Sequence, residues 1–151
     1  MNTPLDAQSI RNKIISLLAR REYSRAELYQ RLQSQAESLE ILNEVLDRMS
    51  QDGYQSDRRF TESFIRQRIS QYWGPKRIVF ELSQKGIPKT MIDQVFDEME
   101  PDWSELAVAL AKKRFDTSKK LAPKEQAKQV RYLLNHGFSY DDVKNALRTE
   151  M

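Results

Sequence analysis

The sequence predicts an all-α protein made of three tandem three-helix repeats, stacked into an elongated, curved array. Two observations support this fold class. Apolar residues recur at helical spacing along the chain, and no segment alternates apolar and polar residues with the β-branched enrichment typical of a strand. Glycine and proline lie at the boundaries of these periodic segments, where helices end and begin. The 151 residues therefore divide into nine expected short helices.

The first repeat is expected over residues 1–52. Ile10 and Ile14 belong to the apolar face of its first helix, and Ser24 followed by Glu27 forms a capping box that starts its second helix. The three expected helices cover residues 6–21, 25–35 and 39–52.

The second repeat is expected over residues 53–100. Gly53 ends the preceding helix, Asp57 is expected to cap the helix that carries Phe60, and Gly74 precedes a proline suited to a first helical turn. The three expected helices cover residues 57–72, 76–85 and 89–99.

The third repeat is expected over residues 101–151. Asp102 and Glu105 have the spacing of a capping box with Asp in the cap position, and Gly137 separates the last two helices. The three expected helices cover residues 102–116, 124–136 and 140–149.

An internal repeat supports this division. When the middle of the chain is shifted by 51 residues, six apolar or glycine positions fall on positions of the same kind, whereas the first third fits more loosely. The matched positions run from Val79, Leu82, Gly86, Ile87, Ile92 and Phe96 to Val130, Leu133, Gly137, Phe138, Val143 and Leu147. A unit of about 50 residues is near the lower limit for independent folding, so neighbouring repeats should stack and share buried surface.

Charge is unevenly distributed although the net charge is only +3. Residues 58–89 and residues 112–131 each contain eight basic and two acidic side chains, and an acidic block extends from Asp93 to Glu105. Basic clusters attract phosphates or acidic protein faces, but a basic run is also typical of a solvated helix face. The segregation of the two signs favours a partner-binding surface, with nucleic acid or a protein bound to nucleic acid as the partner.

Two aromatic positions leave alternatives open. Tyr72 and Trp73, beside Lys76 and Arg77, could stack on bases or belong to the core, and aromatic residues more often belong to the core. His136, directly before a glycine, is expected in the last turn of a helix rather than in a catalytic site.

The composition excludes several kinds of chemistry. The chain has no Cys and one His, which excludes disulfides, thiolate zinc sites, iron–sulfur clusters, Cys nucleophiles and multi-histidine metal sites. The four glycines stand singly and form no phosphate-binding loop. We therefore expect no cofactor, no metal and no enzymatic activity.

The sequence also suggests where the protein works. Its first residues lack the basic-then-apolar pattern of a signal peptide, and the longest apolar stretch is too short to span a membrane. We expect a cytoplasmic protein that makes no membrane contact.

Several motifs, taken in order, carry a family resemblance. The strongest are Gly53-Tyr54-Gln55-Ser56-Asp57-Arg58-Arg59-Phe60, Arg66-Gln67-Arg68, Gly74-Pro75-Lys76-Arg77-Ile78 and Glu81-Leu82-Ser83-Gln84-Lys85-Gly86-Ile87. Two further runs are Arg21-Glu22-Tyr23-Ser24-Arg25-Ala26-Glu27-Leu28 and Gly137-Phe138-Ser139-Tyr140-Asp141. In this order and spacing they resemble the RecX family, the bacterial regulators of the RecA recombinase. Gln55, Ser56 and Thr61 depart from the family pattern, which has an aliphatic residue, Asp and Ala there.

The resemblance implies a non-enzymatic regulator that binds RecA–single-stranded DNA filaments, inhibits their recombinase and ATPase activity, and so modulates DNA repair, recombination and the SOS response. It implies contact with single-stranded DNA directly or through the filament, and we expect a monomer. An alternative is a helical DNA-binding module that acts by occupying single-stranded DNA, because three-helix units are similar to helix-turn-helix domains.

The resemblance and the basic clusters together define the expected sites. The family positions expected to bind the partner are Arg25, Arg66, Arg68, Lys76, Arg77 and Lys85. The two basic windows add Arg58, Lys113, Arg114, Lys128 and Arg131. The positions of the structural motif are Gly53, Tyr54, Asp57, Phe60, Gly74, Gly86 and Gly137.

Overall fold

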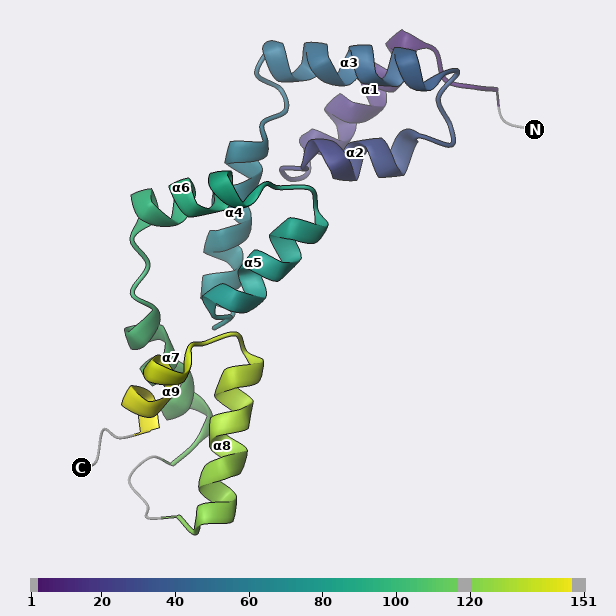
Figure 1. The fold of residues 1–151 in the computed structure, drawn as a ribbon. Helices are drawn as coiled ribbons and strands as arrows, with labels where there is room; N and C mark the ends of the chain where they lie inside the picture. Colours follow the sequence, from purple (N-terminus) through teal and green to yellow (C-terminus); the bar gives the residue numbers. More distant parts are fainter. Residues whose placement is uncertain (1–2, 117–120, 148–151) are drawn as a thin grey trace.

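The computed structural model describes residues 3–116 and 121–147 and confirms the all-α prediction within them (Figure 1). These two ranges hold nine helices and no strand, and their β-type pairing is an isolated bridge between Leu5 and Ala36. The helices are α1 (Ala7–Leu18), α2 (Arg25–Leu32), α3 (Leu39–Gln51), α4 (Asp57–Ser70), α5 (Pro75–Gln84), α6 (Lys89–Met99), α7 (Trp103–Arg114), α8 (Pro123–Asn135) and α9 (Tyr140–Leu147).

The helices begin close to the expected residues, but α1 and α2 end earlier than expected, at Leu18 and Leu32. After Leu18 the chain forms a loop, and this loop brings Tyr23 back to the core, where it is buried. The expected end of the last helix, near residue 149, lies outside the described residues.

Capping side chains start several helices where the sequence indicates. The capping box at α2 is complete: Glu27 N–H donates to Ser24 Oγ at 3.1 Å, and Ser24 N–H donates to Glu27 Oε1 at 3.0 Å. Asp102 caps α7 by accepting from Glu105 N–H at 2.9 Å. The expectation that Asp57 caps α4 is wrong.

Ser56 caps α4 in place of Asp57, accepting from Arg59 N–H at 3.1 Å. Asp57 is the first residue of the helix, so its carboxylate is free to reach a neighbouring repeat. Gly74 has a φ of −86°, which is not left-handed, and it serves as the N-cap of α5. Tyr72, with φ of 67°, is the left-handed residue after α4.

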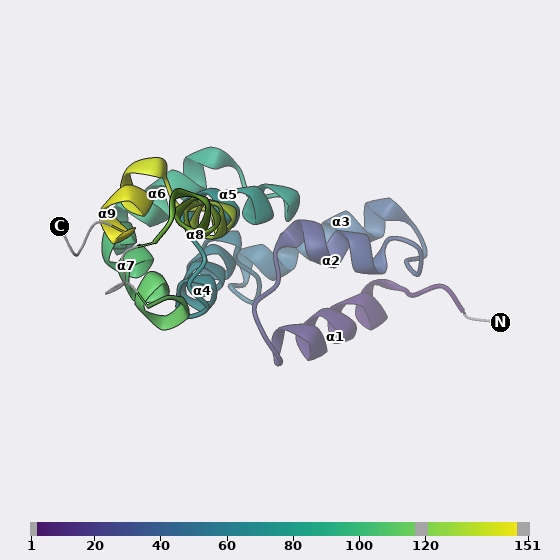
Figure 2. The ribbon, with the colours of Figure 1, turned by 90° about the horizontal axis from the view of Figure 1, so that it is seen from below.

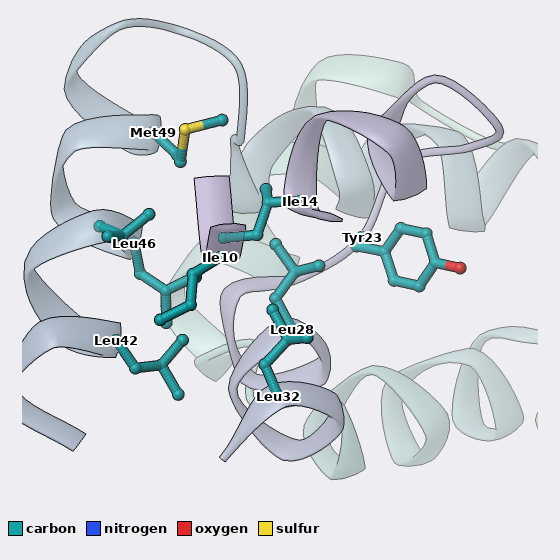
Figure 3. Packing of buried hydrophobic residues seen from close by; sticks show 9 residues of the cluster. Ile10, Ile14, Tyr23, Leu28, Leu32, Leu42, Leu46 and Met49 are labelled. Atoms are coloured by element: carbon teal, nitrogen blue, oxygen red, sulfur yellow. The ribbon is translucent and has the colours of Figure 1, made fainter. Parts of the chain in front are cut away.

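Three hydrophobic clusters follow one another along the chain. The first is buried between α1, α2 and α3 and includes Ile10, Leu28 and Leu46 (Figure 3). The second gathers residues of α4, α5 and α6, and the third gathers residues of α7, α8 and α9. Tyr72 packs against the third cluster and Trp103 against the second, so buried surface continues from one unit to the next.

The three units form an elongated, bent array, as expected (Figures 1 and 2). The second helices, α2, α5 and α8, lie along one side of this array, whereas α3, α6 and α9 lie along the other (Figure 1). The second helices meet end to end. The turn after α8 reaches the start of α5 through a bond from Lys76 N–H to Gly137 O of 3.0 Å, and the turn after α5 reaches α2 through a bond from Lys85 Nζ to Glu27 of 2.9 Å. We call α8, α5 and α2, in this order, the second-helix row.

The turn between α2 and α3 is covered by the segment that precedes α1. Leu5 N–H donates to Gln35 O at 2.8 Å, and Leu5 O accepts from Glu37 N–H at 2.8 Å. This segment therefore lies at the α2 end of the second-helix row.

Candidate partner-binding surface

The basic residues expected to bind a partner separate into two sets in the structure. The first set is already engaged in ion pairs within the chain, so its charge is largely matched. Its members are Arg25 with Asp47, Arg58 with Glu62 and Glu98, Arg68 and Arg77 with Glu81, and Lys85 with Glu27.

Arg68 shows most clearly what these pairs do. Its Nε lies 3.1 Å from Glu81 Oε1, which joins α4 to α5, and its guanidinium covers the Phe64 ring at 4.4 Å. The side chains of Arg68 and Glu81 are only 22% and 19% exposed, so water screens this pair less than it screens a surface pair. Arg77 Nε reaches the same carboxylate at 3.5 Å. Arg68 is therefore part of the internal structure of the second repeat.

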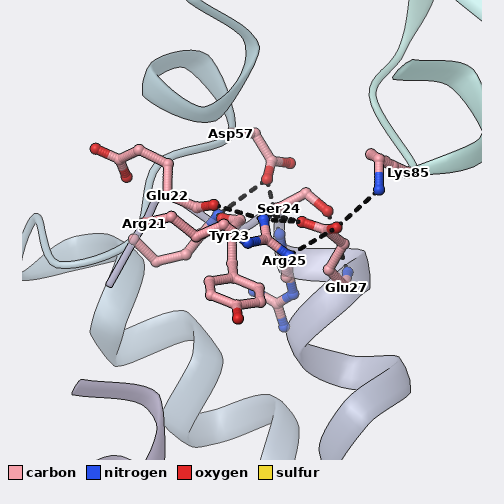
Figure 4. A network of polar contacts seen from close by, with 9 residues as sticks. Arg21, Glu22, Tyr23, Ser24, Arg25, Glu27, Asp57 and Lys85 are labelled. Carbon is pink, nitrogen blue, oxygen red and sulfur yellow. Dashed lines mark hydrogen bonds and ion pairs between the residues drawn. The ribbon is translucent and has the colours of Figure 1, made fainter. Parts of the chain in front are cut away.

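Lys85 and Glu27 hold the first and second repeats together (Figure 4). Glu27 also lies 3.3 Å from Arg21 Nη1 and accepts from the Ser24 N–H of the capping box. Burial by itself would raise the pKa of Glu27, but the bonds from Lys85, Arg21 and Ser24 outweigh it and hold this pKa below its ordinary value. Glu27 is thus kept ionised where the two repeats meet.

Asp57, labelled in Figure 4, makes a second link across this joint together with Gln55. Asp57 Oδ1 accepts from Arg25 N–H and from Gln55 Nε2, both at 2.9 Å. Gln55, which is 3% exposed, also donates to Tyr23 O at 3.2 Å. Gln55, one of the three residues that depart from the family pattern, therefore supplies a buried contact between repeats.

The joint between the second and third repeats is made differently, by backbone groups and rings. Gly74 N–H donates to His136 O at 2.6 Å, in addition to the bond between Lys76 and Gly137. The His136 ring stacks on Trp73 with centroids 4.4 Å apart and an interplanar angle of 16°. As expected, His136 ends a helix, and it takes part in the packing of this joint.

The remaining residues of the structural motif contribute to packing or to turns. Phe60 is 3% exposed and belongs to the second cluster, whereas Tyr54 is 45% exposed and lies 5.2 Å from the Arg11 guanidinium. Gly53 ends α3 with a φ of 82°. Gly86 approaches α2 so closely that an added Cβ would lie 2.6 Å from the Ala26 Cβ.

The second set of basic residues has no acidic partner among residues 3–116 and 121–147. Its members are Arg66, Lys76, Lys113, Arg114, Lys128 and Arg131, and Lys112 and Lys124 share this property. Lys113 and Arg114 lie over the rings of Tyr72 and Tyr132, at 4.6 Å and 5.4 Å from the centroids. Lys119 and Lys120, in the same basic window, lie outside the described residues.

Of the eight cations just named, three lie on α8 and Lys76 lies on α5, so four belong to the second-helix row, whereas Lys112, Lys113 and Arg114 lie on α7. Lys124, Lys128 and Arg131 are spaced by four and three residues, which places them on one stripe of α8, and all three are exposed. Lys76 follows at the start of α5, where the end of α8 meets it. Arg66, by contrast, is on α4 and does not join this row.

The structure also decides between the alternatives for the aromatic residues. Trp73 packs against the second cluster and Tyr72 against the third, so neither ring is free to stack on bases. Phe80 was missed by the sequence analysis and is 57% exposed on α5. The helical spacing could have shown that Phe80 is exposed. It lies two residues from each of the buried Ile78 and Leu82, and therefore on the face of α5 opposite to theirs.

The acidic block lies largely on the other side of the array, on α6 and the start of α7 (Figure 1). Glu98 pairs with Arg58, Asp93 pairs with Lys89, and Asp102 caps α7. Across the described part of the chain, no group of three His, Asp or Glu residues is placed to hold a metal ion. None of the helices described here is long and apolar enough to cross a membrane.

Comparison with known proteins identifies the family. Three family models match in succession, described as the first, second and third three-helix domains of RecX, over residues 11–49, 56–95 and 100–147. The chain is 37% identical over 137 residues to the regulatory protein RecX of Chromohalobacter salexigens, covering 91% of this chain and 90% of that one. It is 41% identical over 133 residues to the regulatory protein RecX of Haemophilus influenzae, covering 87% and 88%.

Solved structures agree with this assignment. The crystal structure of RecX from Lactobacillus salivarius superposes with a TM-score of 0.81 at 25% identity, over 96% of both chains. A second crystal structure, of a regulatory protein RecX, shares the fold with a TM-score of 0.74 at 23% identity, over 95% of this chain and 79% of that one. With three consecutive domain matches and relatives above 30% identity over most of its length, this chain belongs to the RecX family of regulatory proteins.

Proposed function

We propose that this chain regulates the RecA recombinase by binding RecA–single-stranded DNA filaments and inhibiting their ATPase and recombinase activity, without catalysing a reaction of its own. Membership of the RecX family supports this proposal, since its relatives are named regulatory proteins. Through RecA, the protein modulates DNA repair, recombination and the SOS response, and it acts in the cytoplasm as a monomer.

The observation that carries the proposal is the combination of shape and unmatched charge. A bent row of repeats can follow a helical filament and touch several subunits at once, so that weak contacts add to a strong one. The cations on this row that have no acidic partner within the described ranges, Lys76 on α5 and three on α8, should increase the rate of encounter with a nucleoprotein filament, and salt should weaken this effect.

The basic residues that have no acidic partner in the described ranges are the ones to test by mutation. Arg66 and Lys76 are exposed and have no acidic partner in the described ranges, so reversing their charge leaves the fold intact. Arg68, Arg77 and Lys85 are poorer probes because each maintains an internal ion pair.

The experiment is a titration of RecA ATPase activity on single-stranded DNA with this protein at two salt concentrations. The wild-type chain should inhibit, and more strongly at low salt. The double variant Arg66→Glu/Lys76→Glu should inhibit at least about tenfold less well, whereas the control Arg20→Glu/Arg48→Glu, which reverses two exposed cations of the first repeat, should resemble the wild type. Unchanged RecA turnover at a large excess of the wild-type chain would contradict the proposal.

The alternative function, occupation of single-stranded DNA without contact to RecA, is favoured by the exposed Phe80 beside Lys76 on α5. The same titration separates the two functions. A direct effect on the filament persists when free single-stranded DNA is supplied in excess after filament assembly, whereas a chain that only occupies DNA is removed by that competitor.

A further inference from the structure

We propose that a groove between the end of α4 and the start of α7 is a docking site for a basic segment of a partner protein. One large apolar side chain of the segment enters the groove, and the Lys or Arg side chains that flank it meet the carboxylates beside the groove. Neither α4 nor α7 belongs to the second-helix row, so this inference goes beyond the proposed function and does not depend on it.

The groove is apolar and small. Its apolar walls are Ile69 of α4 and, at the start of the third repeat, Pro101, Trp103, Leu106 and Ala109. All five are partly exposed, so a side chain that enters covers apolar surface that water now touches. The volume of the groove is about 270 Å³, whereas pockets for drug-sized ligands begin at about 300 Å³. This size suits a single side chain of a larger partner.

The walls of the groove are held by the cores of two repeats. Ile69 and Trp103 pack against the second cluster, whereas Leu106 packs against the third. The Trp103 ring also meets the Phe96 ring edge to face, with centroids 5.4 Å apart. The groove is therefore formed before a partner arrives, and binding does not require its walls to become ordered.

Carboxylates without a basic partner lie at the groove. Asp102 and Glu105 line it, and both are exposed. Asp97 and Glu100, which precede them in the chain, are exposed as well. Within residues 3–116 and 121–147, none of these four carboxylates pairs with a Lys or Arg. This end of the acidic block therefore carries unmatched negative charge.

The backbone adds to this negative potential. α4 ends at Ser70, one residue past Ile69, and α6 ends at Met99, two residues before Pro101. The C-terminal end of a helix carries a partial negative charge that favours cations. The partially positive N-terminal end of α7 lies here too, but the Asp102 carboxylate caps it. The surroundings of the groove therefore favour a cation over an anion.

These features together select the occupant. A nucleic acid is disfavoured because its phosphates would lie against unpaired carboxylates. A small apolar ligand would leave the carboxylates unused. A protein segment with Lys or Arg on both sides of a large apolar residue satisfies the apolar walls and the charges at once. Burial of the apolar side chain then supplies affinity, and the charges fix the direction of the segment.

The test measures the binding of fluorescent peptides to the full chain. The first peptide has two lysines on each side of a central leucine, the second has serine in place of leucine, and the third has glutamates in place of the lysines. The serine peptide should bind roughly 10-fold more weakly than the leucine peptide, because it buries no apolar side chain. The glutamate peptide should not bind. Equal binding of the leucine and serine peptides would overturn the proposal.

The charges are tested by Asp102→Asn/Glu105→Gln, which removes both carboxylates of the groove and keeps a capping residue at the start of α7. This variant should bind the leucine peptide about 2- to 10-fold more weakly at low salt, and salt should reduce the difference. The matched control is Asp6→Asn/Glu40→Gln, which changes a capping and a first-turn acid of the first repeat. Equal effects of the two double variants would contradict the proposal.

The apolar walls are tested by Ala109→Leu, which fills the groove from the α7 side. It should weaken binding of the leucine peptide roughly 10-fold. Ala127→Leu, at an exposed position of α8, is the matched control and should bind like the wild type. Circular dichroism checks that both variants fold. If Ala109→Leu does not fold, the comparison of the leucine and serine peptides on the wild-type chain decides, because it needs no variant.

Further outcomes separate this groove from other occupants and from the proposed function. Sedimentation that shows a dimer which Asp102→Asn/Glu105→Gln dissociates would make a second copy the occupant and overturn the proposal. A chain that inhibits RecA without discriminating between the peptides overturns the docking site and leaves the proposed function standing. A chain that discriminates between them but leaves RecA turnover unchanged overturns the proposed function and leaves the docking site standing.

Discussion

Gly74 and Gly137 lie back to back where the second repeat meets the third. A Cβ added to Gly74 would lie 2.5 Å from the backbone carbon of Gly137 and 2.6 Å from the Phe138 nitrogen. Both obstructing atoms belong to the backbone, so no side-chain rotation can relieve the clash. The start of α5 and the turn after α8 can therefore lie this close only because neither glycine carries a side chain.

Gly74→Ala should accordingly destabilise the protein by about 2 kcal/mol, since the joint must separate to admit a methyl group. Its φ of −86° is accessible to alanine, so backbone strain does not contribute. Chemical unfolding followed by circular dichroism measures the change. Gly53→Ala is the control: it has nothing within 4 Å but a φ of +82°, and it should cost only about 1 kcal/mol. Equal stability of Gly74→Ala and the wild type would contradict the close approach.

The ion pair between Glu27 and Lys85 should make the first joint depend on pH. The pKa of Glu27 in the folded state is lowered below 4.5, so its stabilising contribution is present above pH 4.5 and is lost as the pH falls through the lowered value. Glu27→Gln, which preserves the capping box, should be less stable than the wild type by about 1 to 2 kcal/mol at pH 7. The difference should shrink in acid.

Urea unfolding at pH 7 and at acidic pH measures this dependence. Asp93→Asn is the control, because the exposed pair between Lys89 and Asp93 should contribute less than about 0.5 kcal/mol. A Glu27→Gln variant as stable as the wild type at neutral pH would show that the pair does not hold the joint.

Replacing Gln55 with an aliphatic residue should destabilise the folded protein. Gln55→Leu leaves the buried Tyr23 carbonyl without its donor and Asp57 without one of two, so we expect a loss of about 1 to 2 kcal/mol. Gln51→Leu, an exposed change of the same kind at the end of α3, should alter the free energy of unfolding by less than about 0.5 kcal/mol. A Gln55→Leu variant of unchanged or higher stability would mean that water replaces the lost donors.

Arg66 and Arg68 should differ sharply although they are two residues apart. Arg68→Glu places a second carboxylate against the partly buried Glu81 and should cost more than about 2 kcal/mol, whereas Arg66→Glu should leave stability within about 0.5 kcal/mol. Thermal unfolding of the two variants checks this. Similar melting temperatures would show that Arg68 is as free to bind a partner as Arg66.

The helices could be predicted from the sequence because their signals are local. The spacing of Ile78 and Leu82, the capping box at Ser24 and the glycine at position 137 each act within a few residues. The choice of Asp57 as a cap was wrong because Ser56, one residue earlier, competes for the same role. The limits drawn between repeats, at residues 52 and 100, stay a prediction.

The candidate surface was predicted less completely because it depends on contacts between distant residues. Lys85 and Glu27 are 58 positions apart, and nothing in a window around Lys85 indicates that its charge is matched. Counting bases therefore overstated the charge of residues 58–89, where most cations are paired, and described α8 better, where they are not. Phe80 was missed for a local reason. An apolar residue within an apolar segment is expected to be buried, and only its position on the helix shows that it faces solvent.

The pairing of Leu5 with the turn after α2 has a consequence for assembly. In the other two repeats the corresponding turn docks against a neighbour, at Gly86 and at Gly137. In the first repeat that docking position is taken by Leu5, whose backbone bonds to Gln35 and Glu37 close it off. Another copy of the chain would have to displace Leu5 before it could dock end to end at this turn.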